Sequence, residues 1–129
     1  MTPIFTHQLE VRFRDCDPMG HVNNAVFLTY IESARAAFLQ HLGAVQTLED
    51  LAIIVARIEI DFRAPVRFGD EIEVSVRVSR FGEKSFDLEH ELRVGDTLVA
   101  EAKTVLVTYD YERREPVVIP EAWREKLAA

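Results

Sequence analysis

The stretch RDCDPMGHVNNAVFLTYIESARAAFLQHLG, residues 14–43, sets a polar loop directly before the one long helical pattern in the chain. Pro18 and Gly20 disfavour helix and strand in its first third, so we expect a loop there. This loop carries two carboxylates, a thiol, an imidazole and two side-chain amides. Such a concentration of functional groups makes it the first place to look for chemistry.

The second part of the stretch has the spacing of one helix face. Its apolar residues recur three or four positions apart, at Phe27, Ile31, Ala34, Phe38 and Leu42. Asn23 or Asn24 is the expected N-cap, and Gly43 is the expected stop. We therefore predict one long amphipathic helix here, and a short terminal helix at 121–127.

Segments on both sides of this helix alternate between apolar and polar residues at period two, the pattern of half-buried strands. They span 5–14, 54–62, 71–78, 86–94 and 98–106. The order is one strand, the long helix and then four strands. This order predicts an antiparallel sheet with one apolar face and a single helix to cover that face.

The composition fits one globular domain, which we expect to span residues 1–129. The chain has 48% hydrophobic residues, but none of its apolar runs approaches the length of roughly 20 residues that a membrane helix needs. We therefore expect no membrane role. The net charge of −7 disfavours nucleic-acid binding, which needs a basic surface. The N-terminus lacks a signal-peptide pattern and the single cysteine cannot form an internal disulfide, so we expect a cytoplasmic protein.

The segment 13–24, followed by Tyr30, Glu32 and Arg35 on the helix, resembles the hotdog-fold acyl-CoA thioesterases of the 4-hydroxybenzoyl-CoA thioesterase superfamily. The later segment 65–70 also matches that family. The resemblance implies an α+β hotdog fold, in which a five-stranded antiparallel sheet wraps around one long central helix. It further implies a homodimer or homotetramer with active sites at the subunit interface, and an acyl-CoA substrate.

The resemblance also implies roles for single residues. Asp17 corresponds to the catalytic second aspartate of the family's Asp-x-Asp-x-x-Gly motif. His21 would be its catalytic partner, because the His-Val-Asn-Asn run is similar to the loop of plant acyl-ACP thioesterases. Arg80 and Lys84 flank the turn after the third strand, where related thioesterases bind the phosphates of CoA.

The chemistry of a thioester is consistent with these roles. Its leaving thiolate has a pKa of about 8.5, so hydrolysis needs a nucleophile and a site for the oxyanion more than it needs an acid. Asp17 would attack the carbonyl carbon or activate water, while His21 would position water or hydrogen-bond Asp17. Amides near the helix start, from Gly20 to Asn24, would stabilise the oxyanion. Asn23 is the third candidate catalytic residue, and the side-chain amides of Asn23 and Asn24 would help to orient the substrate.

Each of these residues also has an ordinary structural interpretation. Asp15 and Asp17 could cap turns, and Asn24 could cap the helix. Glu32 could reach a neighbouring active site and help to orient the substrate, or it could pair with Arg35. The sequence alone leaves these alternatives open.

No glycine-rich phosphate loop and no spaced cluster of Cys and His residues is present, so neither a metal nor another cofactor is expected.

The alternatives to an acyl-CoA thioesterase are an acyl-ACP thioesterase, a hotdog hydratase or dehydratase, and a non-catalytic acyl-CoA-binding protein. The acyl chain itself is not specified by the sequence.

Overall fold

The computed structural model describes residues 4–43 and 52–128. Its elements are β1 (Phe5–Glu10), the short 3-10 helix η1 (Phe13–Asp15), α1 (Asn24–His41), β2 (Ile53–Phe62), β3 (Glu71–Phe81), β4 (Ser85–Val94), β5 (Thr97–Asp110), β6 (Glu115–Pro116) and α2 (Glu121–Ala128). The predicted order of one strand, a long helix and four strands is confirmed. The short helix expected near the C-terminus is also present, as α2.

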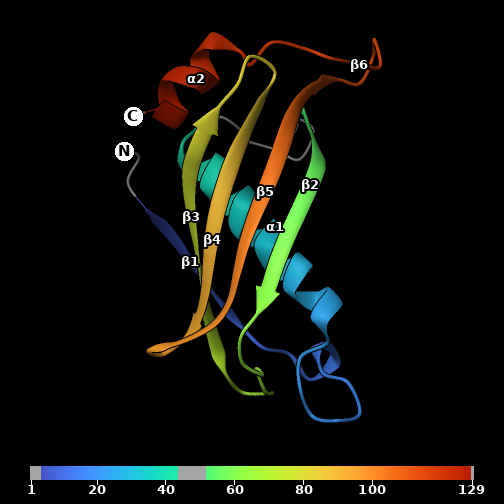
Figure 1. Ribbon diagram of the computed structural model, residues 1–129, viewed down its shortest axis with the longest axis vertical. Helices are drawn as coiled ribbons and strands as arrows, with labels where there is room; N and C mark the ends of the chain where they lie inside the picture. Colours follow the sequence, from blue (N-terminus) through green and yellow to red (C-terminus); the bar gives the residue numbers. More distant parts are fainter. Residues whose placement is uncertain (1–3, 44–51, 129) are drawn as a thin grey trace.

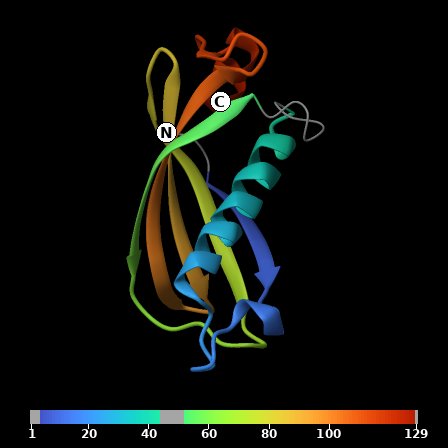
Figure 2. The same cartoon turned by 90° about the vertical axis from the view of Figure 1, so that its right-hand side faces the viewer.

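The strands form one antiparallel sheet with the order β1-β3-β4-β5-β2. Figure 1 shows α1 crossing the sheet diagonally, and Figure 2 shows the sheet curving around it. The predicted hotdog arrangement of a sheet wrapped around a long central helix is therefore confirmed. The strand count differs slightly, because the two-residue β6 pairs with the end of β5 as a sixth strand.

The core lies between α1 and the concave face of the sheet. On α1 the buried apolar residues include Phe27, Ile31, Ala34 and Phe38, which are the positions that the helical spacing predicts. The sheet contributes the alternating apolar residues of its central strands, among them Ile72, Val74, Val76, Leu88, Leu92, Ala100 and Leu106. In the described residues, no helix is both long and apolar enough to cross a membrane.

The ends of α1 follow from local chemistry. The side chain of Asn23 accepts a hydrogen bond from the Ala25 amide, which makes Asn23 the N-cap. At the other end Leu42 is the C-cap, and Gly43 follows with a φ of 74°. Glycine adopts this left-handed conformation without strain, so the predicted stop at Gly43 is confirmed.

The first strand is shorter than the predicted span 5–14. It ends at Glu10, and η1 follows. The turn forms because the Asp15 side chain accepts a hydrogen bond from the Arg12 amide, which the alternating pattern could not indicate. Phe13, which we expected to share the buried face with Val11, is 79% exposed as a result.

The pattern predicted for 54–62 is wrong in its first half. A β-bulge between Val55 and Arg57 shifts the register of β2 against β5. The bulge reverses the alternation, so that Ile53 is 8% exposed while Ile54 is 37% exposed. Beyond the bulge, Ile58 and Ile60 face inward as predicted.

His90 is a buried polar residue in the middle of β4, with 2% of its surface exposed. Its Nδ1 lies 3.1 Å from the Ser75 carbonyl oxygen and its Nε2 lies 3.1 Å from the Thr104 hydroxyl. Because a carbonyl only accepts, Nδ1 carries the proton and Nε2 accepts from Thr104. Burial is the main cause that lowers the pKa of His90 to about 4, and the charge of Arg35 acts in the same direction.

As the pH falls from 7 to 4, protonation of His90 alone is expected to lower the free energy of unfolding by about 3 kcal/mol. The unfolded chain protonates this histidine near pH 6.5, whereas the folded chain does so only near pH 4. Protons therefore favour the unfolded state across that window.

Urea denaturation from pH 7 to pH 4 tests this. His90→Gln should show a shallower loss of stability than the wild type over the window. The matched control is His41→Gln, which replaces an exposed histidine of α1 and should keep the wild-type slope. Equal slopes for wild type and His90→Gln would contradict the prediction.

Candidate active site

A depression of about 530 Å³ lies at the N-terminal end of α1. It is lined by Asp17, Met19, His21, Val22, Asn23, Asn24, Phe27, Phe62, Arg63, Ala64 and Pro65. The structure thus brings four of the predicted site residues to one concave surface, where the loop, α1 and the end of β2 meet. The lining combines polar residues of the loop with the apolar side chains of Phe27 and Phe62.

The loop is a small hairpin. Cys16 and Val22 form a bridge, and the Asp17 amide donates to the His21 carbonyl oxygen at 2.9 Å. The turn closes where the Gly20 amide donates to the Asp17 carbonyl oxygen at 2.9 Å. Gly20 has a φ of 83°, a left-handed conformation that glycine adopts without strain. The hairpin holds Asp17 and His21 opposite each other at its mouth.

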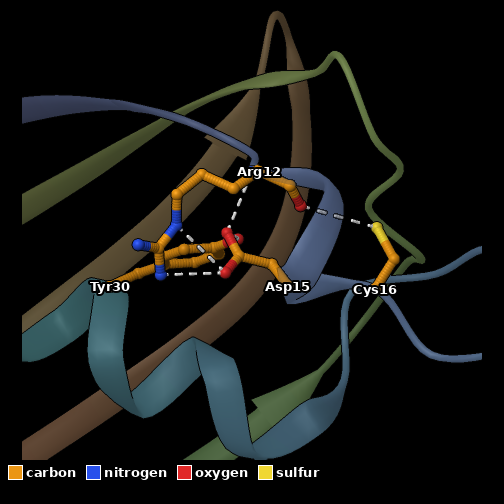
Figure 3. A network of polar contacts seen from close by, with 4 residues as sticks. All are labelled: Arg12, Asp15, Cys16 and Tyr30. Carbon is orange, nitrogen blue, oxygen red and sulfur yellow. Dashed lines mark hydrogen bonds and ion pairs between the residues drawn. The ribbon is translucent and has the colours of Figure 1, made fainter.

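Asp15 anchors this hairpin to α1 (Figure 3). Its carboxylate is 3% exposed and accepts hydrogen bonds from the Tyr30 hydroxyl at 2.8 Å and from the Arg12 amide at 3.0 Å. The Arg12 guanidinium adds an ion pair at 3.0 Å. Burial by itself would raise the pKa of Asp15, but these donors outweigh it and hold the pKa below its ordinary value. Asp15 therefore has a structural role, and its bond to the buried Tyr30 joins the turn before the hairpin to α1.

Asp17 is half-buried and has a different environment. Its Oδ1 accepts a hydrogen bond from the Met19 amide at 3.0 Å, which is an Asx-turn. Within the described residues its Oδ2 has no partner. Asp17 therefore stabilises the turn with one oxygen, and the residue lines the depression.

The start of α1 supplies amides to the same depression. The Ala25 amide is satisfied by the Asn23 side chain, and the Gly20 amide by Asp17. In the described part of the chain, the amides of His21 and Asn24 have no acceptor. Of the two residues predicted to supply an oxyanion site, Asn24 has a free amide in this conformation and Gly20 does not. The positive end of the helix dipole lies at Asn24.

The segment 63–70 supports the hairpin from the other side. His21 and Arg67 form an antiparallel bridge, and the Val22 amide donates to the Val66 carbonyl oxygen at 2.7 Å. The backbone of His21 is thus fixed. The His21 imidazole makes no hydrogen bond to any described residue, so it is available to a ligand.

Glu32 lies elsewhere. It lines a separate depression of about 310 Å³ with Arg35, between α1 and β2. Its carboxylate is 3.9 Å from the Arg35 guanidinium, which agrees with the pairing that the sequence left open. At a rise of about 1.5 Å per residue, Glu32 is roughly 12 Å along the helix from Asn24. A single chain does not bring Glu32 into the site of Asp17.

Arg80 and Lys84 also lie far from the loop. Figure 1 shows the turn between β3 and β4 at the opposite end of the molecule from the start of α1. An eleven-residue strand such as β3 spans on the order of 35 Å. Arg80 is paired with Asp87 at 2.9 Å and donates to Ser85, while the Lys84 side chain has no partner in the described residues. Their contact with CoA phosphates stays a prediction.

Phe62 and Arg63 also line the depression, although neither is among the predicted site residues. Phe62 packs edge to face against Phe27, with ring centroids 5.2 Å apart, and Arg63 donates to Glu101 at 2.7 Å. Both residues directly precede the segment 65–70, and the resemblance of that segment to the family is the signal that could have pointed to them.

In the part of the chain that the structure describes, no three His, Cys, Asp or Glu side chains are grouped to hold a metal ion.

The polar hairpin before a central helix also matches a known family. The model of the thioesterase-like superfamily matches residues 11–127, which include the whole hairpin, α1 and the sheet from β2 onward. This chain is a member of the thioesterase-like superfamily. The expected family resemblance is therefore confirmed.

Several proteins with thioesterase names are similar to this chain over most of its length. A long-chain acyl-CoA thioesterase of Escherichia coli is 29% identical, with 93% of this chain and 94% of that protein covered. A chloroplastic acyl-acyl carrier protein thioesterase of Arabidopsis thaliana is 32% identical, with coverage of 94% and 67%. A crystal structure of a Thermus thermophilus thioesterase with coenzyme A and Zn superposes with a TM-score of 0.89 at 40% identity, covering 98% of each chain.

The Asp15→Asn variant is expected to lose about 2 kcal/mol of unfolding free energy at pH 7, because it removes the charge that the Arg12 and Tyr30 donors stabilise. The folded pKa of Asp15 lies below its unfolded value near 3.8. Its contribution is therefore present above that value and is lost as the pH falls through the folded pKa.

Chemical denaturation at pH 7 and at pH 3 measures this effect, and the difference between wild type and variant should shrink at the lower pH. Asp96→Asn, at an exposed turn, is the control and should change stability by less than about 0.5 kcal/mol. A difference that is the same at both pH values would show that Asp15 acts by packing and not by charge.

Proposed function

We propose that this protein is an acyl-CoA thioesterase that hydrolyses its substrate to a free acid and CoA. The observation that carries the proposal is that Asp17 and Asn24 line one concave surface, where an Asp17 oxygen and the Asn24 amide have no partner among the described residues. A nucleophile or base and an oxyanion donor are the two groups that thioester hydrolysis needs. The names of the similar proteins support the same substrate class.

The reaction follows from these groups. Asp17 either takes a proton from water, which then attacks the carbonyl carbon, or attacks that carbon itself to form an anhydride that water later opens. In both routes the carbonyl oxygen gains negative charge, and the Asn24 amide at the positive end of α1 stabilises it. The C–S bond then breaks and the CoA thiolate leaves. No metal or organic cofactor is needed, because the thiolate is a good leaving group.

His21 and the two asparagines complete the polar wall in this proposal. The His21 imidazole is close in the chain to Asp17 and positions the attacking water or hydrogen-bonds the carboxylate. Asn23 holds the helix start by its cap, so its role is to fix the Asn24 amide. The Asn24 side chain orients the thioester.

We infer that a second copy of the chain completes the site. β2 is an edge strand of the sheet, and unpaired edges favour association. Phe62, at the end of β2 and in the wall of the depression, is 45% exposed. A partner that covers this edge would exclude water from the acyl chain and bring its own residues, such as Glu32, closer to the site.

Turnover of a panel of short, medium, long and aromatic acyl-CoAs is expected to fall at least about 100-fold in Asp17→Asn. The asparagine oxygen can still accept the bond from the Met19 amide, so the turn is kept and only the charge is lost. Free-thiol release is the assay, with folding and oligomeric state measured for each protein.

Asp110→Asn is the matched control, because the Asp110 side chain caps a turn in the same way by accepting from the Glu112 amide. This variant should keep wild-type turnover. Full activity of a folded Asp17→Asn protein would exclude Asp17 as nucleophile or base. Hydrolysis of acyl carrier protein thioesters without hydrolysis of any acyl-CoA would instead favour the carrier protein as partner.

A further inference from the structure

Two phenylalanines next to the candidate site are exposed together. Phe13 in η1 is 79% exposed and Phe68 in the connection from β2 to β3 is 63% exposed. Their rings meet edge to face with centroids 5.9 Å apart. In an edge-to-face pair, one ring points its edge at the face of the other. Neither face of that first ring is covered by its partner. Single scattered apolar residues are ordinary on a protein surface, whereas contiguous exposed apolar surface can mark a binding site.

Each of these phenylalanines has an arginine neighbour without a partner. In the described residues, the side chains of only three arginines make no hydrogen bond or ion pair, namely Arg14, Arg67 and Arg114. The other arginines form ion pairs or hydrogen bonds, as Arg63 does with Glu101 and Arg80 with Asp87. Arg14 directly follows Phe13 and Arg67 directly precedes Phe68, and both are exposed without a partner in the described residues of a chain whose net charge is −7.

This cluster is continuous with the candidate site. Arg14 is followed directly by the hairpin that carries Asp17, and Arg67 forms the antiparallel bridge with His21. Residues paired in this way have neighbouring side chains on the same side of the pair. A ligand bound over Phe13, Phe68, Arg14 and Arg67 would therefore lie at the edge of the depression and not at the far end of the molecule.

We propose that the Phe13/Phe68 pair with Arg14 and Arg67 binds the adenosine 3′-phosphate 5′-diphosphate end of a CoA thioester. An adenine ring stacks on an open aromatic face, and guanidinium groups bind phosphate oxygens through two parallel hydrogen bonds. This deepens the proposed function, on which it rests, by placing the nucleotide of CoA beside the hairpin instead of at Arg80 and Lys84.

The size of the cluster favours a nucleotide over a protein surface. A stable protein partner covers roughly 800 Å² on each side, with a central cluster of apolar anchors. Two rings and two arginines match instead the one base and the phosphate groups of a single nucleotide. An acidic carrier protein is therefore an outcome of the test and not part of the proposal.

The test separates nucleotide binding from hydrolysis. Isothermal titration calorimetry with adenosine 3′,5′-bisphosphate and with free CoA measures binding to wild type, Arg14→Gln, Arg67→Gln and Phe68→Leu. Each substitution should raise the Kd about tenfold, the loss expected for one charge-assisted hydrogen bond or one stacked base. Arg114→Gln, which removes the third unpaired arginine far from the site, should bind as the wild type does.

Kinetics provides the second readout. The arginine variants should raise the KM for an acyl-CoA by the same factor and leave kcat unchanged, because they act on the carrier and not on the reacting atoms. With the matching acyl-pantetheine thioester, which lacks the nucleotide, wild type and variants should be equal. A rise in KM with both substrates would show a general effect on the loop and would overturn the proposal.

Three other outcomes would also decide where the nucleotide binds or whether the thioester is hydrolysed. Wild-type bisphosphate binding in the Arg14 and Arg67 variants, with loss in Arg80→Gln and Lys84→Gln, would place the nucleotide at the other end of the sheet. An effect confined to acyl carrier protein thioesters would identify a protein partner instead. If the wild type binds the bisphosphate through Arg14 and Arg67 but hydrolyses no thioester, the proposed hydrolysis fails and the nucleotide site stands.

Discussion

The buried carboxylate of Asp15 lies where the chain leaves β1 and turns toward α1. An ionised carboxylate in that position needs several donors, because burial without them costs several kcal/mol. Arg12 supplies donors from the preceding turn and Tyr30 supplies one from the second turn of α1. Satisfying one charge therefore fixes the start of the helix relative to the first strand. The position of the hairpin between them follows from this constraint.

Two aspartates two residues apart have separate roles because their surroundings differ. All the bonds of Asp15 are made within the chain, and it is almost completely buried. Asp17 stands on the outer side of the hairpin, where only one of its oxygens is used by the turn. The Asp15 carboxylate holds the turn and α1 together, and the Asp17 residue lines the depression. The Asn24 amide, held in place by the Asn23 cap, completes the polar part of that wall.

Much of this could be predicted from the sequence, because the periodicity of apolar residues reports directly on which face of an element is buried. The helix from Asn24 and the antiparallel sheet follow from that signal, and the loop before the helix follows from Pro18 and Gly20. The bulge beside Val55 and the turn at Arg12 do not, since a single displaced residue or side-chain hydrogen bond leaves no periodic trace. The wall formed by Phe62 depends on a tertiary contact across the fold, which no local pattern encodes.

The bridge between His21 and Arg67 ties the hairpin to the connection between β2 and β3. Lengthening or shortening residues 63–70 would thus tilt the hairpin as a unit, without altering any residue on it. That connection also carries Arg67 and Phe68 and follows the wall at Phe62. A change of length in this one connection would therefore move the hairpin that carries Asp17 and the apolar wall at Phe62 together.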